Sequence, residues 1–170
     1  MAALLAVVGR KGSGKAEILA RLINLLSGRG LRVGVIKHLA REDFEIDEPG
    51  KDTFQYRAEG AQTVMLAGRQ RLAVFSNLER EMPLEDLLAF FRDFDLVFLE
   101  GYFCADVATL EVYKRDSREL LLTERARNLL AICSEEETGR DVPHFSPGEL
   151  DSLASLIEAK ILAKEAEVSS

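Results

Sequence analysis

The residues best suited to chemistry form a glycine-rich run that ends in a lysine, Gly9-Arg10-Lys11-Gly12-Ser13-Gly14-Lys15. Glycines let the backbone curl so that its N–H groups point inward at a phosphate, and the lysine brings positive charge to the outer phosphates of a nucleotide. An apolar stretch over 2–8 precedes the run and a helical pattern over 17–26 follows it, so a helix N-terminus also faces the phosphate. The pattern predicts phosphate binding by Gly12, Ser13, Gly14 and Lys15, and the alternative is a plain strand-to-helix turn.

The residue after the lysine departs from the usual pattern of such loops. That position normally holds Ser or Thr, whose hydroxyl binds Mg²⁺, and here it is Ala16. Nucleotide binding and nucleotide hydrolysis are therefore separate questions. We keep Ala16 among the nucleotide-binding residues and expect hydrolysis to be very slow or absent. Ser13 and Thr53 are the alternative sources of a hydroxyl.

A second candidate residue, Glu100, follows an all-apolar segment over 96–99 that is typical of a buried strand. A carboxylate at the carboxyl end of such a strand can bind Mg²⁺, directly or through water, or orient the attacking water. We therefore assign Glu100 as the catalytic residue and as the metal ligand. The alternative is a strand-end glutamate that caps a loop or pairs with a lysine.

The elements that must position these residues alternate between strand and helix patterns. Strand patterns lie over 2–8, 31–37, 62–67, 71–75, 96–99, 109–113 and 129–133, and helical patterns over 17–26, 51–60, 84–92 and 147–166. The segments over 62–67 and 71–75 meet at a tight turn, and the first strand, helix and second strand make a parallel βαβ unit. The pattern predicts an α/β, P-loop NTPase-like fold with a mostly parallel central sheet flanked by helices. We expect one nucleotide-binding domain over 1–164 and a frayed tail over 165–170.

Composition limits the class of protein. The chain has 170 residues, of which 47% are hydrophobic, and a formal net charge of −7. Nucleic-acid binders concentrate positive charge, so a nucleic-acid partner is not expected. Cys104 and Cys133 lack the spacing of a zinc site or a disulfide framework, which fits a reducing compartment. No stretch reaches the length of a membrane span, and we expect a cytoplasmic protein that binds no membrane.

Several segments, taken in order, resemble the MobB family of small GTP-binding accessory proteins in molybdopterin guanine dinucleotide biosynthesis. They are Gly12-Ser13-Gly14-Lys15, Val35-Ile36-Lys37-His38, the run over 44–53, Ala58-Glu59-Gly60-Ala61 and Leu99-Glu100-Gly101-Tyr102. The resemblance covers residues 1 to about 102 and continues weakly to the end. Its most specific part is Asp47-Glu48-Pro49-Gly50-Lys51-Asp52, because many families share phosphate loops.

The resemblance implies a homodimer in which each subunit binds GTP with Mg²⁺. It implies as partners molybdopterin and the guanylyltransferase of molybdenum cofactor synthesis, which itself carries out the nucleotidyl transfer. The residues that would border the nucleotide are Lys37, His38, Asp47, Lys51 and Asp52. Alternatively, His38 is a hydrogen-bonded loop residue, and Lys51 and Asp52 form only the charge arrangement of a helix N-terminus. Three departures from the family pattern stand beside these residues: Ala16 in place of a hydroxyl residue, Leu39-Ala40-Arg41 in place of a stretch that commonly holds more histidines, and Phe103 in place of a usual lysine. Together they remove metal coordination and one positive charge from the phosphate region.

Guanine recognition has two candidate segments. Guanine is distinguished by a carboxylate that accepts hydrogen bonds from its N1 and exocyclic amine. Tyr113-Lys114-Arg115-Asp116 has the Lys-x-Asp spacing of a guanine-binding motif, which assigns Asp116 to the nucleotide site, and Ser134-Glu135 follows another strand. Each is alternatively a solvated loop.

The function that these features favour is a GTP-binding accessory protein of molybdenum cofactor biosynthesis with weak or absent GTPase activity. A P-loop small-molecule kinase is one alternative, and it requires an acceptor pocket and an arginine-rich lid. A non-hydrolysing, dimeric nucleotide-binding scaffold is the other, and Ala16 favours it.

Overall fold

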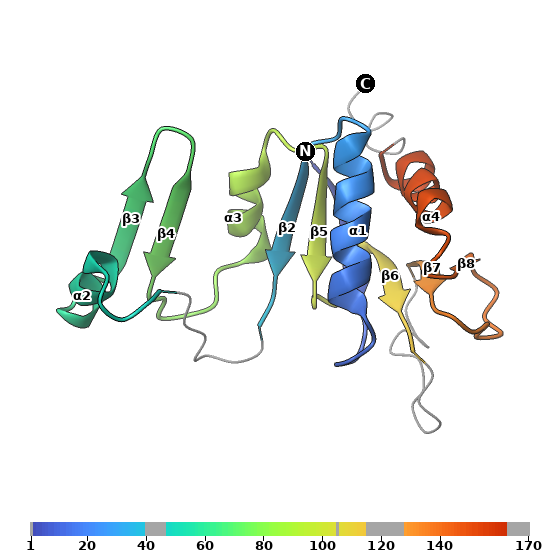
Figure 1. The fold of residues 1–170 in the computed structure, drawn as a ribbon, viewed down its shortest axis with the longest axis horizontal. Coiled ribbons are helices and arrows are strands. Elements are labelled where there is room, and N and C mark those ends of the chain that lie inside the picture. Colours follow the sequence, from blue (N-terminus) through green and yellow to red (C-terminus); the bar gives the residue numbers. More distant parts are fainter. Residues whose placement is uncertain (1, 40–46, 105, 115–127, 163–170) are drawn as a thin grey trace. The chain divides into compact units, whose positions relative to one another are not determined.

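Six short, mostly apolar strands form the central sheet, in the order β2-β5-β1-β6-β7-β8 (Figure 1). Every neighbouring pair in it is parallel. The strands are β1 (Ala3–Val8), β2 (Val33–Lys37), β5 (Leu96–Glu100), β6 (Ala108–Val112), β7 (Leu129–Cys133) and β8 (His144–Phe145). The computed structural model describes residues 2–39, 47–104, 106–114 and 128–162. Together with the helices below, this sheet confirms the predicted P-loop NTPase-like α/β fold.

The described residues divide into two units. We call residues 1–38 and 89–170 the sheet unit, and residues 39–88 the hairpin unit. The hairpin unit contains the antiparallel strands β3 (Thr63–Ala67) and β4 (Leu72–Ser76) and the helices α2 (Asp52–Ala58) and α3 (Leu84–Leu88). The sequence predicted both strands to within a residue or two.

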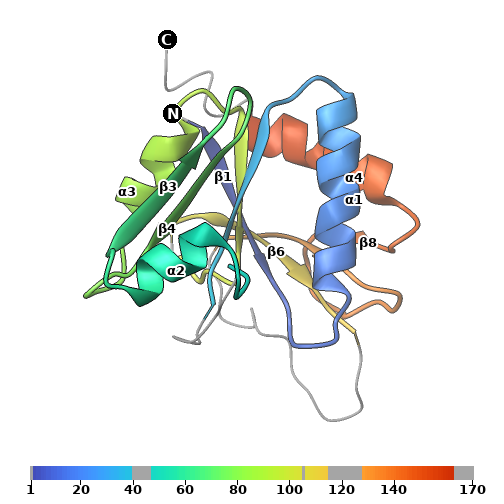
Figure 2. The same ribbon diagram turned by 60° about the vertical axis from the view of Figure 1, so that its left-hand side comes forward.

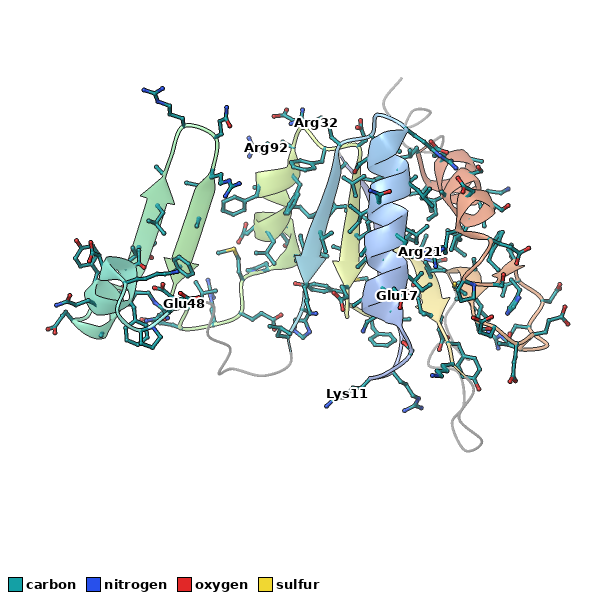
Figure 3. All side chains as sticks on the ribbon, viewed as in Figure 1. Lys11, Glu17, Arg21, Arg32, Glu48 and Arg92 are labelled. Carbon is teal, nitrogen blue, oxygen red and sulfur yellow. The ribbon has the colours of Figure 1, made fainter. Side chains whose placement is uncertain are left out.

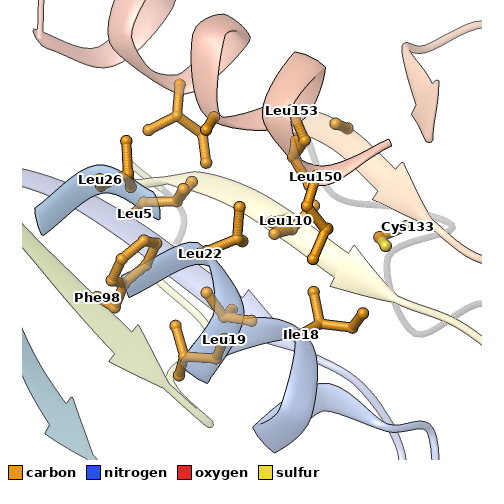
Figure 4. Packing of buried hydrophobic residues seen from close by; sticks show 14 of the residues in the cluster. Leu5, Ile18, Leu19, Leu22, Leu26, Phe98, Leu110, Cys133, Leu150 and Leu153 are labelled. Carbon is orange, nitrogen blue, oxygen red and sulfur yellow. The ribbon is translucent and has the colours of Figure 1, made fainter. Parts of the chain in front are cut away.

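Helices α1 (Lys15–Gly28) and α4 (Leu150–Ile157) cover the same face of the sheet (Figure 2). Helix α1 buries Ile18, Leu19, Leu22 and Leu26, whose spacing places them on one side of a helix. They pack with alternate residues of the strands, such as Leu5 and Phe98, and with residues of α4 such as Leu153 (Figure 4). This packing fixes the direction in which α1 leaves the loop before it.

Strand β5 lies between β1 and β2, and it aligns the candidate site. All of its residues are buried, as expected for a central strand of a parallel sheet. The predicted βαβ unit is therefore present and parallel, but its two strands are not neighbours. In the register of the sheet, Glu100 of β5 is level with both Lys37 of β2 and Val7 of β1.

The predicted boundaries of two helices were wrong. The pattern over 84–92 is the short helix α3 followed by a 3₁₀ turn, η1 (Ala89–Phe91), whose Phe91 packs edge-to-face with Phe94. The last helix begins at Leu150 instead of 147, because the Glu149 side chain accepts hydrogen bonds from the backbone N–H and hydroxyl of Ser146 and closes a turn there. These bonds lower the Glu149 pKa. A π-helical turn, η2 (Glu158–Leu162), follows α4, and the predicted tail lies outside the described residues.

No helix within the described ranges combines the length and the apolar character needed to cross a bilayer.

Candidate functional site

The loop over 9–14 connects β1 to α1 at the carboxyl edge of the sheet. Gly12 and Gly14 have φ angles of +84° and +82°, in the left-handed region that strains other residues. Apart from each glycine's chain neighbours, no atom of the described residues lies within 4 Å of where a side-chain carbon would start at either glycine, so those residues leave the space beside them open. Gly14 is the N-cap of α1 and, having no side chain, provides no acceptor for the first N–H groups of the helix. The loop has the geometry of an anion site.

The beginning of the loop is tightly packed. A side-chain carbon added to Gly9 would lie 2.5 Å from the Val112 carbonyl oxygen and 2.7 Å from Ser13 Oγ, so only glycine fits there. Ser13 Oγ is buried and has no hydrogen-bond partner among the described residues. Lys11, by contrast, extends away from the loop (Figure 3) and is exposed, as expected for plain surface charge.

Glu100 joins two lysines from different elements. Its Oε1 lies 3.7 Å from Lys15 Nζ and 3.5 Å from Lys37 Nζ. Lys15 Nζ also donates a hydrogen bond of 3.3 Å to the Gly9 carbonyl, so its side chain folds back over the loop. Glu100 is 8% exposed, whereas the Lys37 side chain is 53% exposed. The structure therefore brings together three predicted site residues, Lys15, Lys37 and Glu100, which carry two positive charges and one negative charge.

His38 continues the β2 ladder beyond the strand. Its backbone N–H donates to the Glu100 carbonyl at 2.9 Å, and its ring lies 5.1 Å from the Tyr102 ring, centroid to centroid. Gly101, which lies between Glu100 and Tyr102 in the chain, has a φ of +83°. A side-chain carbon added to it would lie 3.3 Å from the His38 carbonyl oxygen. His38 thus lies directly beside the Lys15–Glu100–Lys37 group, and its ring packs on the loop that follows β5.

Asp47, Lys51 and Asp52 lie in the hairpin unit, and Asp47 and Lys51 have partners close to them in the sequence. Asp47 Oδ1 accepts hydrogen bonds from Thr53 Oγ1 at 2.9 Å and from the Glu48 N–H at 3.0 Å, and its Oδ2 lies 3.8 Å from an Arg57 nitrogen. Lys51 pairs with Glu48 at 2.9 Å, a hydrogen bond that raises the Lys51 pKa. Asp52 is the first residue of α2, where a negative charge suits the helix dipole. These contacts are those of a helix start.

The two guanine-recognition candidates differ in what can be said of them. Asp116 lies outside the described residues, and its role stays a prediction. Ser134 follows β7 and is buried; its hydroxyl donates to the Glu136 carbonyl at 2.6 Å and lies 2.7 Å from His144 Nε2. The link between His144 and this loop was missed by the sequence interpretation, because β8, which carries His144, is only two residues long.

The residues present do not fit a magnesium site built from protein side chains. Ala16 offers no oxygen, Ser13 Oγ is buried against Gly9, and Thr53 Oγ1 already donates to Asp47. Glu100 faces two ammonium groups. Within the part of the chain that the structure describes, no group of three or more His, Cys, Asp or Glu residues is placed to hold a metal ion.

The two cysteines are free thiols in different environments. Burial raises the pKa of the Cys133 thiol to about 11, and it raises that of Cys104 as well. The thiolate is the reactive form of cysteine, so both groups are poor nucleophiles at neutral pH.

Comparison with known proteins gives one family. The family model described as "Molybdopterin guanine dinucleotide synthesis protein B" (MobB) matches residues 4–135. The chain is 30% identical to the molybdopterin-guanine dinucleotide biosynthesis adapter protein of Escherichia coli K12, over 92% of each chain. It is 28% identical to the adapter protein of Haemophilus influenzae, over 91% of this chain and 87% of that one. A crystal structure of molybdopterin-guanine biosynthesis protein B superposes with a TM-score of 0.71 at 27% identity, over 92% of this chain and 98% of that one. The chain therefore belongs to the MobB family, as the sequence motifs had predicted.

Proposed function

We propose that this protein is an accessory protein of molybdopterin guanine dinucleotide biosynthesis that binds GTP at the loop over 9–15. The observation that carries the proposal is the position of Lys15, which folds back over an open, glycine-rich loop toward Glu100. Family membership and the adapter role named for the relatives support the biosynthetic part. Proteins with a P-loop fold have many functions, so the fold alone does not identify the pathway. The assignment to this pathway depends on family membership.

Binding exchanges one set of partners of Lys15 for another. In the structure the Lys15 ammonium group is shared between the Gly9 carbonyl and Glu100, at distances of 3.3 and 3.7 Å. A phosphate oxygen in the loop offers a shorter, charge-assisted hydrogen bond to the same group. The N–H groups at the start of α1 supply further donors. Lys37, His38, Asp47, Lys51, Asp52 and Asp116 stay predicted members of the nucleotide site.

Hydrolysis is proposed to be weak or absent. Catalysis of phosphoryl transfer depends on positive charge and on a group that orients the attacking water. Glu100 is the candidate for the second role, but its carboxylate is held between two lysines, and Ala16 removes the usual hydroxyl. The position of Glu100 between two lysines and the lack of a hydroxyl at Ala16 also favour the alternative function, a non-hydrolysing nucleotide-binding scaffold.

A homodimer is the assembly that we propose, with the hairpin unit as its contact. Strands β3 and β4 pair only with each other among the described strands, and a lone two-stranded sheet is marginally stable in water. Met65, Leu72 and Val74 lie on one face of it and are 60%, 60% and 42% exposed. A second copy that covers this face would remove apolar area from water. Light scattering should give the mass of a dimer, and Val74→Lys should reduce it to that of a monomer, whereas a wild-type monomer at all concentrations contradicts the dimer.

The proposed partners are molybdopterin and the guanylyltransferase that attaches the guanosine nucleotide to it. In this scheme the transferase carries out the bond-forming step and the present protein supplies or holds the nucleotide. The free, buried thiol of Cys133 supports a reducing, cytoplasmic location.

The experiment that tests the core proposal is calorimetric titration of the purified protein with GTP, GDP, ATP and guanosine. We expect GTP to bind more tightly than ATP, and guanosine to bind weakly because it lacks the phosphates that the loop contacts. Equal affinity for guanosine and GTP contradicts the phosphate loop as the binding site. Robust phosphate transfer from GTP to a small acceptor would replace the accessory role by that of a kinase.

A further inference from the structure

Lys37 places a second ammonium group at the proposed phosphate site. It ends β2 at the level of Glu100 in the register, and its Nζ lies 3.5 Å from the oxygen that Lys15 also approaches. The two lysines come from different elements, α1 and β2, and meet only because β5 carries Glu100 between them. Lys37 is also the more exposed of the two, so its ammonium group is accessible to a ligand at the sheet edge.

The same site has no side-chain oxygen suited to Mg²⁺, as described above. In a loop with Ser or Thr after the lysine, the metal ion neutralises the charge of the β- and γ-phosphates and bridges their oxygens. With Ala16 at that position, the loop has no hydroxyl after the lysine to bind the ion. A triphosphate bound here still needs its charge offset, and Lys15 and Lys37 are two cations that lie together at the end of the loop, 3.7 and 3.5 Å from Glu100.

We infer that this chain binds the phosphates of its nucleotide without Mg²⁺, with the Lys37 ammonium group in the charge-neutralising role of the metal ion. Glu100 then pairs with both lysines at the loop until phosphate takes its place. The inference rests on the proposed function, because it concerns the same site. It adds that affinity for GTP does not depend on a divalent cation.

A purely structural role for Lys37 predicts something different. The pair joins an exposed lysine to a buried carboxylate that Lys15 also faces, so the loss of Lys37 alone should change stability little. If Lys37 did no more than neutralise Glu100, replacing it would change the melting temperature slightly and leave nucleotide affinity intact. The two roles therefore separate in a binding measurement.

The test is titration of the full-length protein with GTP, once in excess Mg²⁺ and once in EDTA. We expect wild-type affinities that agree within about twofold, and a loss of about tenfold for Lys37→Met in both conditions, which corresponds to about 1.4 kcal/mol. Lys37→Arg, which keeps the charge, should retain most of the affinity. Ala16→Thr should bind more tightly in Mg²⁺ than in EDTA, because it restores the hydroxyl.

The matched control is Lys160→Met, which removes one positive charge beside Leu4 and Ala108, at the amino ends of β1 and β6 and thus at the opposite edge of the sheet. It should leave GTP affinity unchanged. Wild-type binding that tightens tenfold or more in Mg²⁺ overturns the inference but leaves the proposed function intact. Unchanged affinity of a folded Lys37→Met variant also overturns it. Failure of GTP to bind in either condition overturns the proposed function and the inference with it.

Discussion

Glu100 and Asp47 are both buried carboxylates that face positive charge, and each is 8% exposed, but they are held in opposite ways. Glu100 meets lysines that lie far from it in the sequence, at 3.5 and 3.7 Å. Asp47 accepts hydrogen bonds of 2.9 and 3.0 Å from Thr53 and Glu48 and lies 3.8 Å from Arg57, three partners that are at most ten positions away. The sheet assembles the first group, and one helix start assembles the second.

The difference indicates which partners are available to a ligand. The lysines around Glu100 are at ion-pair distance, and Lys15 makes its hydrogen bond to a loop carbonyl, so both ammonium groups can turn to a phosphate at small cost. The donors around Asp47 stabilise the start of α2, and turning them elsewhere would leave buried polar groups unpaired. The comparison therefore predicts effects on binding for one group and on stability for the other.

The largest effect is expected at Lys15. Lys15→Ala should weaken GTP binding about 100-fold, or about 2.7 kcal/mol, because the phosphates lose their closest charge-assisted partner. Guanosine affinity should stay the same, since it carries no phosphate. Calorimetry on both ligands measures the difference, and Lys11→Ala, which removes an exposed lysine of the same loop, is the control. An equal loss for GTP and guanosine would mean that Lys15 only supports the fold.

Asp47→Ala should instead lower stability. It leaves Thr53 Oγ1 and Arg57 Nη1 without the carboxylate, a change of about 2 kcal/mol for hydrogen bonds to a charged group. The thermal midpoint should fall by roughly 4 °C, as measured by circular dichroism. Asp47→Asn should be milder because it retains an acceptor at Oδ1. A fall in GTP affinity with little change in the midpoint would contradict the stability role and support the predicted place of Asp47 in the nucleotide site.

The variant Glu100→Gln tests the carboxylate of the lysine-paired group itself. It keeps the side-chain volume but removes the negative charge between two lysines, so GTP affinity should be retained or rise about threefold. Any slow GTP hydrolysis should fall, because the carboxylate is the candidate for orienting water. GTPase rate and thermal midpoint are measured side by side with affinity. Unchanged hydrolysis together with a lower midpoint would make Glu100 a structural strand-end residue.

Much of this contrast depends on features that local sequence patterns do not contain. The glycine run, the apolar strand before Glu100 and the hairpin were predictable, because each has its own periodicity or turn chemistry. The pairing of Lys37 with Glu100 was not, because it requires β5 to lie between β1 and β2, and strand order is set by tertiary packing. The hydrogen bond from Thr53 to Asp47 was not predictable either, because a family motif does not show which groups pair at the start of a helix.

The smallest effect is expected at Glu149, a carboxylate that, like Asp47, accepts hydrogen bonds from a residue close to it in the sequence. Hydrogen bonds from the Ser146 backbone and hydroxyl lower its pKa below the ordinary 4.5, so the charged form is favoured in the folded state. A lowered folded-state pKa means that the stabilisation is fully present above 4.5 and is lost as pH falls through the lowered value. Glu149→Gln should therefore reduce the thermal midpoint slightly at neutral pH, and the difference from wild type should vanish in strong acid. Glu137→Gln, in an exposed loop, should show no such pH-dependent difference. A difference that persists in strong acid would mean that the turn before α4 depends on the shape of the side chain and not on its charge.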